Sequence, residues 1–117
     1  MFCIFVTKLS LMDRMHQLQS LHNEDPNDLF VRFAIAKEYE KAGDTLMAIE
    51  QYEKILELNA DYIGVYYHLA HLYGEQDRID DAMDLYDKGI GVSKKIADFH
   101  AMSELLNAKK NLEMENL

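Results

Sequence analysis

The chain has 117 residues, enough for one domain and too few for two ordinary ones. Its composition, 49% apolar and 28% charged, is that of a globular protein, and one Pro and five Gly supply too few turns for an all-β fold. A net charge of −9 repels a phosphate backbone, so we expect no nucleic-acid partner. The single cysteine, Cys3, excludes an internal disulfide and indicates a reducing, cytoplasmic location.

The N-terminal segment is the most apolar part of the chain. Residues 1–11, MFCIFVTKLSL, contain eight apolar residues, but no basic residue precedes the apolar run as it does in a signal peptide. We interpret this segment as an over-extended start or an apolar tail, with an edge strand or a membrane-touching tail as the alternative. No stretch reaches the roughly 18 apolar residues that span a bilayer, so we expect no membrane partner.

Apolar residues at helical spacing predict six helices and no strand. The first covers residues 12–24. The next five begin close to an aspartate: Asp28, Asp44, Asp61, Asp80 and Asp98. Of these, Asp44 and Asp61 are placed to cap their helices. The second helix is expected to stop near Gly43, a residue type that favours helix ends.

The middle of the chain repeats itself at an offset of 34 residues. The matching motifs are Ile35-Ala36-x2-Tyr39 with Leu69-Ala70-x2-Tyr73, and Ala48-x3-Tyr52 with Ala82-x3-Tyr86. The alanines are expected where two antiparallel helices cross, because a larger side chain would push the helices apart. The tyrosines are expected to fill the space between successive hairpins.

A 34-residue helix–turn–helix unit with these motifs resembles the tetratricopeptide repeat. The resemblance covers about residues 28–93 and implies an all-α fold, with hairpins stacked as a short right-handed superhelix. Two repeats need covered ends, as in the small stand-alone bacterial proteins of this family. We therefore expect residues 12–117 to form one domain, divided into an N-terminal cap (12–24), two repeats (28–61 and 62–95) and a C-terminal cap (97–115).

Two residues of the second copy depart from the family pattern. Asp77 stands in place of the turn glycine. Gly89 replaces the usual Ala late in its helix, which should weaken that helix by about 1 kcal/mol.

The resemblance also implies a binding face, since ligands of this family lie along the first helix of each unit. The corresponding residues are Phe30, Phe33, Lys37 and Glu40 in the first copy and Tyr67, His68, His71 and Glu75 in the second. Their helical spacing places each set on one face. Aromatic rings with one Lys and two His suit an extended peptide with apolar side chains and an acidic group. The alternative is that the N-terminal helix covers Phe30 and Phe33.

Other chemistry has less support. His68, His71 and Glu75 have a spacing compatible with a metal, but no third His or Cys lies nearby, so we expect no metal and no cofactor. The acidic run from Glu75 to Asp87 lacks the Gly and the terminal Glu of a calcium loop. We interpret it as a solvated outer face, with attraction of a basic partner as the alternative. No nucleophile motif is present, so we expect the protein not to be an enzyme.

The sequence thus predicts a non-catalytic interaction module that binds a segment of a partner protein in a concave groove. The alternative is a structural protein that forms a homodimer through an exposed cap or through the apolar N-terminus.

Overall fold

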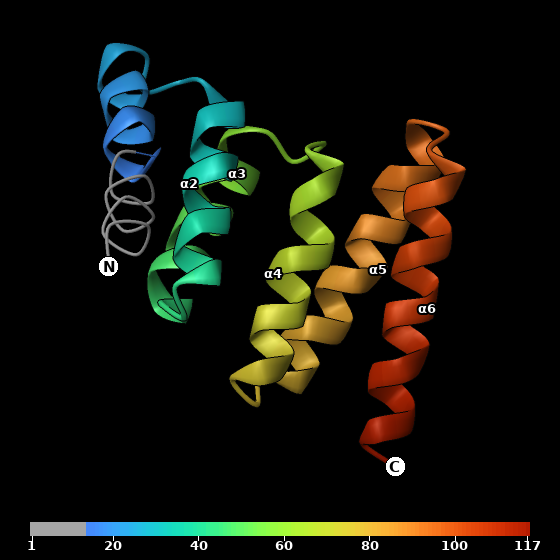
Figure 1. Cartoon of the computed structure of the whole chain (residues 1–117). Helices are drawn as coiled ribbons and strands as arrows, with labels where there is room; N and C mark the ends of the chain where they lie inside the picture. Colours follow the sequence, from blue (N-terminus) through green and yellow to red (C-terminus); the bar gives the residue numbers. More distant parts are fainter. Residues whose placement is uncertain (1–13) are drawn as a thin grey trace, which may run out of the picture. The chain divides into compact units, whose positions relative to one another are not determined.

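The computed structural model describes residues 14–117, which form six helices and no strand (Figure 1). Residues 14–24 are helical, and the labelled helices are α2 (Leu29–Lys41), α3 (Thr45–Leu58), α4 (Ile63–Glu75), α5 (Ile79–Lys95) and α6 (Phe99–Glu115). The predictions of an all-α fold and of six helices are confirmed. Our interpretation of residues 1–11 falls outside the described residues. None of the helices described is both long and apolar enough to cross a bilayer.

The chain divides into two compact units, and each is described by itself. The first ends at Gln51, and the second runs from Tyr52 to Leu117. In the first unit, an ion pair of 2.9 Å between Arg14 Nε and Glu38 Oε1 links the first helix to α2. Arg32 Nη1 donates a hydrogen bond of 2.9 Å to Gln51 Oε1, which links α2 to α3. In the second unit, α5 packs between α4 and α6, and α4 also contacts α6.

The small residues of the repeat motifs lie in the core. No solvent reaches Ala36, Ala48, Ala70 or Ala82. Their burial agrees with a position at helix crossings, where only a small side chain lets two backbones approach closely. The tyrosines of the second hairpin's motifs are buried as well, with Tyr73 9% and Tyr86 4% exposed.

Three helices end in the same turn. The residue that follows the C-cap has a left-handed backbone at Gly43 (φ 80°), Asp77 (φ 61°) and Ala97 (φ 58°). The next residue donates a backbone hydrogen bond of 2.9 Å to the carbonyl five positions earlier, in the pairs Asp44–Tyr39, Arg78–Tyr73 and Asp98–Ser93. This is the Schellman arrangement, which satisfies carbonyls at a helix end. The turn therefore keeps its geometry although only one of the three positions is a glycine.

Two of the aspartates near which the sequence predicted a helix to begin are helix caps. Asp28 and Asp98 cap α2 and α6, each accepting a hydrogen bond of 3.0 Å from a backbone N–H of the first turn. The expectation that Asp61 caps α4 is wrong. The N-cap is Tyr62, whose side chain makes no capping hydrogen bond. The Asp61 carboxylate instead accepts hydrogen bonds of 2.9 and 3.1 Å from Lys95 Nζ.

Candidate functional site

A ladder of ring contacts runs along α4 from the core to the surface. The ring of His68 is stacked on that of Tyr52, with centroids 5.6 Å apart. Tyr67 meets His68 edge-on at 5.8 Å and is stacked on His71 at 6.5 Å, with 6° between the ring planes. Tyr52 is buried, whereas Tyr67 is 41% exposed. The buried end of the ladder therefore holds in place an aromatic ring that solvent can reach.

The ladder continues to a carboxylate. His71 Nε2 lies 3.1 Å from Glu75 Oε1, one helical turn further along, and both side chains are about half exposed. The structure thus brings together all four residues that the sequence predicted for the second copy: Tyr67, His68, His71 and Glu75.

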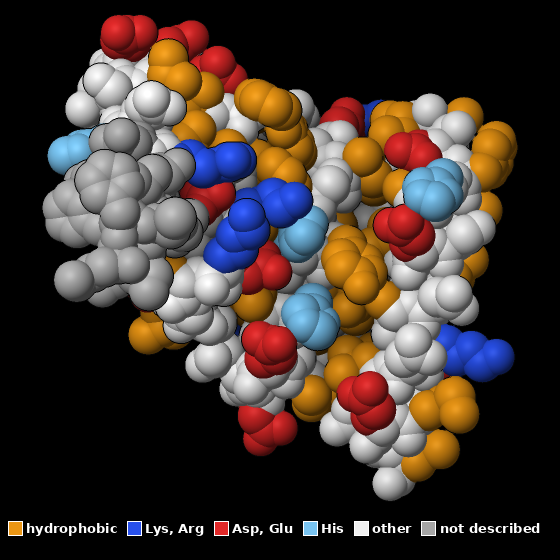
Figure 2. All heavy atoms as spheres, viewed as in Figure 1, with side chains coloured by type: hydrophobic (Ala, Val, Ile, Leu, Met, Phe, Trp, Pro, Cys, Tyr) orange, Lys and Arg blue, Asp and Glu red, His pale blue; other side chains and the backbone are white. Residues whose placement is uncertain are grey.

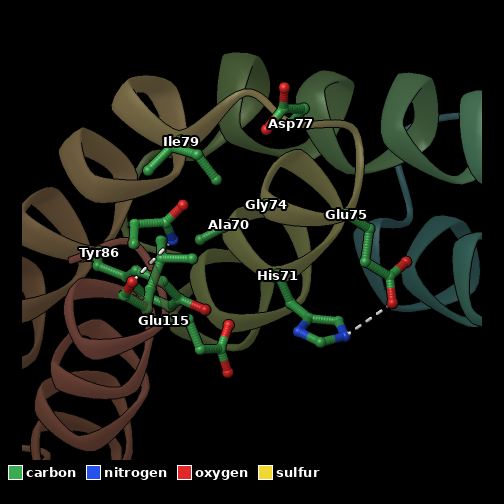
Figure 3. Close-up of a pocket in the computed structure, with 10 residues that line it drawn as sticks. Ala70, His71, Gly74, Glu75, Asp77, Ile79, Tyr86 and Glu115 are labelled. Atoms are coloured by element: carbon green, nitrogen blue, oxygen red, sulfur yellow. Dashed lines mark hydrogen bonds and ion pairs between the residues drawn. The ribbon is translucent and has the colours of Figure 1, made fainter.

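Two pockets open beside this ladder, between α4 and α6. The larger, of about 540 Å³, is lined by Tyr67, His68, Glu104, Asn107, Ala108 and Asn111. The other, of about 360 Å³, is lined by Ala70, His71, Gly74, Glu75, Asp77, Ile79, Tyr86, Leu112, Glu115 and Asn116 (Figure 3). We call the residues that line these two pockets the α4–α6 groove. Figure 2 shows this face, with hydrophobic and His side chains in the hollow and acidic side chains beside it.

The α6 side of this groove was missed by sequence reasoning. Glu104, Asn107 and Asn111 lie on α6, which the sequence identified only as a capping helix. The available signal was the spacing of the two asparagines, one helical turn apart on the polar side of a helix. Each Asn amide offers both hydrogen-bond donors and acceptors, as an extended peptide backbone requires.

The predicted residues of the first copy lie in the first unit. Lys37 Nζ lies 5.8 Å from the ring centroid of Phe33, and these positions correspond by the 34-residue offset to His71 and Tyr67. Each copy therefore places a cationic or titratable group beside an exposed or half-buried aromatic ring. The other two predicted residues differ in burial, since Phe30 is 74% exposed and Glu40 is partly buried.

Two features bear on the chemistry of the groove. Burial raises the pKa of Tyr86 to about 12, and the Glu115 carboxylate acts in the same direction, so the phenol keeps its proton at neutral pH. Within residues 14–117, no three His, Cys, Asp or Glu side chains are grouped as metal ligands. The two histidines contact the ring of Tyr67 instead.

A profile of the tetratricopeptide repeat matches residues 39–102. Curated protein sequences gave no significant match. Among solved structures, a tetratricopeptide repeat domain protein from Salinibacter ruber, studied by NMR in solution, is 42% identical. The alignment covers 76% of this chain and 90% of that one, with a TM-score of 0.72.

Two more distant structures share the fold. The TPR2B domain of yeast Sti1, in complex with pHsp70, is 14% identical with a TM-score of 0.81, over 95% of this chain and 89% of that one. PcrH, in complex with the chaperone-binding region of PopD, is 12% identical with a TM-score of 0.81, over 96% and 85%. The match to the repeat profile and the likeness to the Salinibacter protein show that the chain belongs to the tetratricopeptide repeat family.

Proposed function

We propose that this chain is a non-catalytic interaction module that binds an extended segment of a partner protein in the α4–α6 groove. The observation that carries the proposal is Tyr67, an exposed ring of α4 that lines a pocket together with polar side chains of α6. A rigid aromatic ring anchors apolar side chains of a ligand at small entropic cost. Asn107 and Asn111 face the same pocket and suit the hydrogen-bonding groups of a peptide backbone.

Two structural neighbours support the proposal. The yeast Sti1 domain and PcrH share the fold, and both are seen in complex with a protein ligand or a region of one. The groove described here is short and consists of two small pockets, so we expect modest affinity.

The test is selection of ligands from a displayed peptide library with the full chain, followed by measurement of the selected peptides on variants. Tyr67→Ala removes the exposed ring, and Asn111→Ala removes one amide. We expect each variant to weaken binding about tenfold, as central interface residues do. Phe99→Ala is the matched control, because Phe99 is an exposed ring of α6 that lies outside the groove. Equal binding by Tyr67→Ala and Phe99→Ala would place the ligand elsewhere.

The first unit offers an equivalent contact. Because Phe33 and Lys37 repeat the arrangement of Tyr67 and His71, we propose that this pair also contacts protein ligands, together with Phe30 and Glu40. Lys37→Glu reverses the charge beside the ring and should weaken binding of any selected peptide that carries an acid. Unchanged affinity for every acidic peptide would remove the first unit from the binding site. We also retain as a proposal the division of residues 12–117 into two capped repeats.

Self-association is the second candidate function, and a specific observation favours it. Phe99 and Leu106, seven residues apart on one stripe of α6, are 66% and 48% exposed. Exposed apolar stripes of this kind often mark an interface. Light scattering should then show a dimer of the full chain that dissociates in a Phe99→Ser, Leu106→Ser variant. A monomeric full chain would dismiss this candidate.

A further inference from the structure

The lining of the α4–α6 groove is acidic. Four of the residues that line its two pockets carry a carboxylate: Glu75, Asp77, Glu104 and Glu115. None of the lining residues is Lys or Arg. Glu75 and Glu104 lie beside histidines, at 3.1 Å from His71 and 2.8 Å from His100. Glu115 and Asp77 have no ion-pair partner within the described part of the chain.

The basic side chains of the second unit do not neutralise this lining. Four of them pair with carboxylates outside the groove: Arg78 with Asp81, Lys88 with Asp84, Lys95 with Asp61 and Lys109 with Asp87. The nitrogen-to-oxygen distances are 3.0, 3.0, 2.9 and 2.6 Å. These four carboxylates outside the groove each have a cation within ion-pair distance, while the groove keeps an excess of negative charge.

Helix ends add to the same potential. The smaller pocket lies where α4 ends, at Gly74 and Glu75, and where α6 ends, at Glu115. A helix C-terminus carries partial negative charge on its free carbonyls and favours a cation. The positive end of α5 also reaches this pocket at Ile79, but its first turn contains two acids, Asp80 and Asp81. The balance of charge at the pocket is therefore negative.

We propose that the α4–α6 groove selects a basic segment, an extended peptide whose Lys or Arg side chain enters the pocket between Glu75 and Glu115. This inference rests on the proposed peptide-binding function and names the chemistry of the ligand. An apolar residue of the same segment packs on Tyr67, the exposed ring of the adjoining pocket. An arginine suits the pocket best, because its planar fork can bond one carboxylate through two N–H groups while its stem lies along apolar Leu112.

This ligand differs from the one that the sequence alone suggested. The expectation of an acidic group rested on Lys37, which belongs to the first unit, together with His68 and His71. In the second unit, the equivalent position is His71, and this side chain already faces a carboxylate. The two copies therefore differ at equivalent positions, a lysine in the first and a histidine beside a carboxylate in the second, and the second copy determines the preference of the α4–α6 groove.

The test compares three pools of short synthetic peptides that share aromatic and aliphatic anchors and differ only in charge: Lys and Arg, Gln, or Asp and Glu. Binding of fluorescent peptides to the full chain is measured by anisotropy. We expect the basic pool to bind about fivefold to tenfold tighter than the Gln pool, the range of two or three exposed charge pairs. Glu75→Gln with Glu115→Gln should abolish this difference.

The matched control is Glu57→Gln with Glu113→Gln, which removes the same charge from exposed glutamates outside the groove. A preference that survives in the control and disappears in the groove variant supports the inference. Equal loss in both variants would mean general attraction to an acidic surface and would overturn it. Equal or tighter binding of the Gln or acidic pool would also overturn it while leaving peptide binding intact. Binding of no pool would instead refute the proposed function.

Discussion

Gly89 of α5 lies so close to Tyr66 of α4 that a Cβ atom on Gly89 would be 2.8 Å from the Cβ of Tyr66. The same atom would be 3.0 Å from Leu105 Cδ1, a buried side chain of α6. The absence of a side chain at this one position therefore lets three helices meet. A Cβ of Tyr66 cannot move without its backbone, so the contact has little room to relax.

Gly89→Ala should destabilise the protein although Ala is the better helix former. The gain in helix propensity is about 1 kcal/mol, whereas overpacking of this kind costs about 1–3 kcal/mol, so we expect a net loss. Gly91→Ala is the matched control, because a Cβ there meets nothing within 4 Å. That variant should gain about 0.5–1 kcal/mol. Urea unfolding of the two variants measures both, and a stabilised Gly89→Ala would contradict the close approach.

Two of the three left-handed turn residues, Asp77 and Ala97, are not glycine, and we expect substitution by glycine to stabilise the protein to different degrees at the two positions. Ala97→Gly should raise the free energy of unfolding by about 1 kcal/mol, because a Cβ is strained at a φ of 58°. Asp77→Gly should gain less, since Asp tolerates this region better than Ala. Ala42→Gly is the control, at an ordinary φ of −76°, and should be destabilising. Thermal unfolding ranks the variants, and a gain in the control equal to that of Ala97→Gly would refute the explanation.

Stability should fall at alkaline pH through the titration of two buried tyrosines, Tyr73 and Tyr86. Burial raises the pKa of Tyr73 to about 12, with the Glu53 carboxylate acting in the same direction, and Tyr86 likewise titrates at about 12. Above pH 10 the unfolded state releases these protons while the folded state retains them. The stabilisation is therefore complete below pH 10 and disappears as the pH rises through 12.

Urea midpoints measured between pH 9 and about pH 12 check this prediction. The comparison is with Tyr73→Phe and Tyr86→Phe, each of which should lose part of the pH dependence because Phe has no proton to release. The ultraviolet absorbance of tyrosinate reports the same protons directly. A pH profile unchanged in both variants would assign the alkaline loss of stability to other groups.

The ion pair between Asp61 and Lys95 should contribute little to stability. Both side chains are about half exposed or more, at 45% and 67%, and solvent screens their attraction. A double-mutant cycle with Asp61→Ala and Lys95→Ala should give a coupling energy of about 0.2–1 kcal/mol that diminishes in high salt. A coupling energy far above this range, unaffected by salt, would show that the pair is shielded from water.

Much of the fold could be predicted because the same core positions occur in both copies of the repeat. Ala36 and Ala70 share one register, as do Ala48 and Ala82, and all four are buried. A period of 34 residues with small side chains at fixed places constrains the helix crossings without any knowledge of the rest. Helix boundaries were within a residue or two where an acid or glycine marked them, as at Asp28 and Gly43.

The features that the sequence did not predict depend on contacts between residues that are far apart along the chain. The local sequence marks Asp61 as a helix cap, but its carboxylate is bound by Lys95, which lies two helices further along the chain. The local sequence marks Gly89 as a weak point of its helix. Its contribution to packing comes from the close approach of Tyr66 and Leu105 on other helices, which the local sequence does not show. From the sequence, Asn107 and Asn111 look like solvated polar residues, because the sequence does not show which side of α6 faces α4.

The ion pair between Asp61 and Lys95 joins two residues that are one repeat length of 34 residues apart. The two residues therefore occupy equivalent positions of successive repeats and are also neighbours in space. Correlated substitutions at such positions carry two signals, one from the duplication of the unit and one from physical contact. A statistical analysis of an alignment that scores only covariation will mix them. The second unit gives a way to separate the two, because opposite charges at equivalent sites report contact, whereas identical residues report descent.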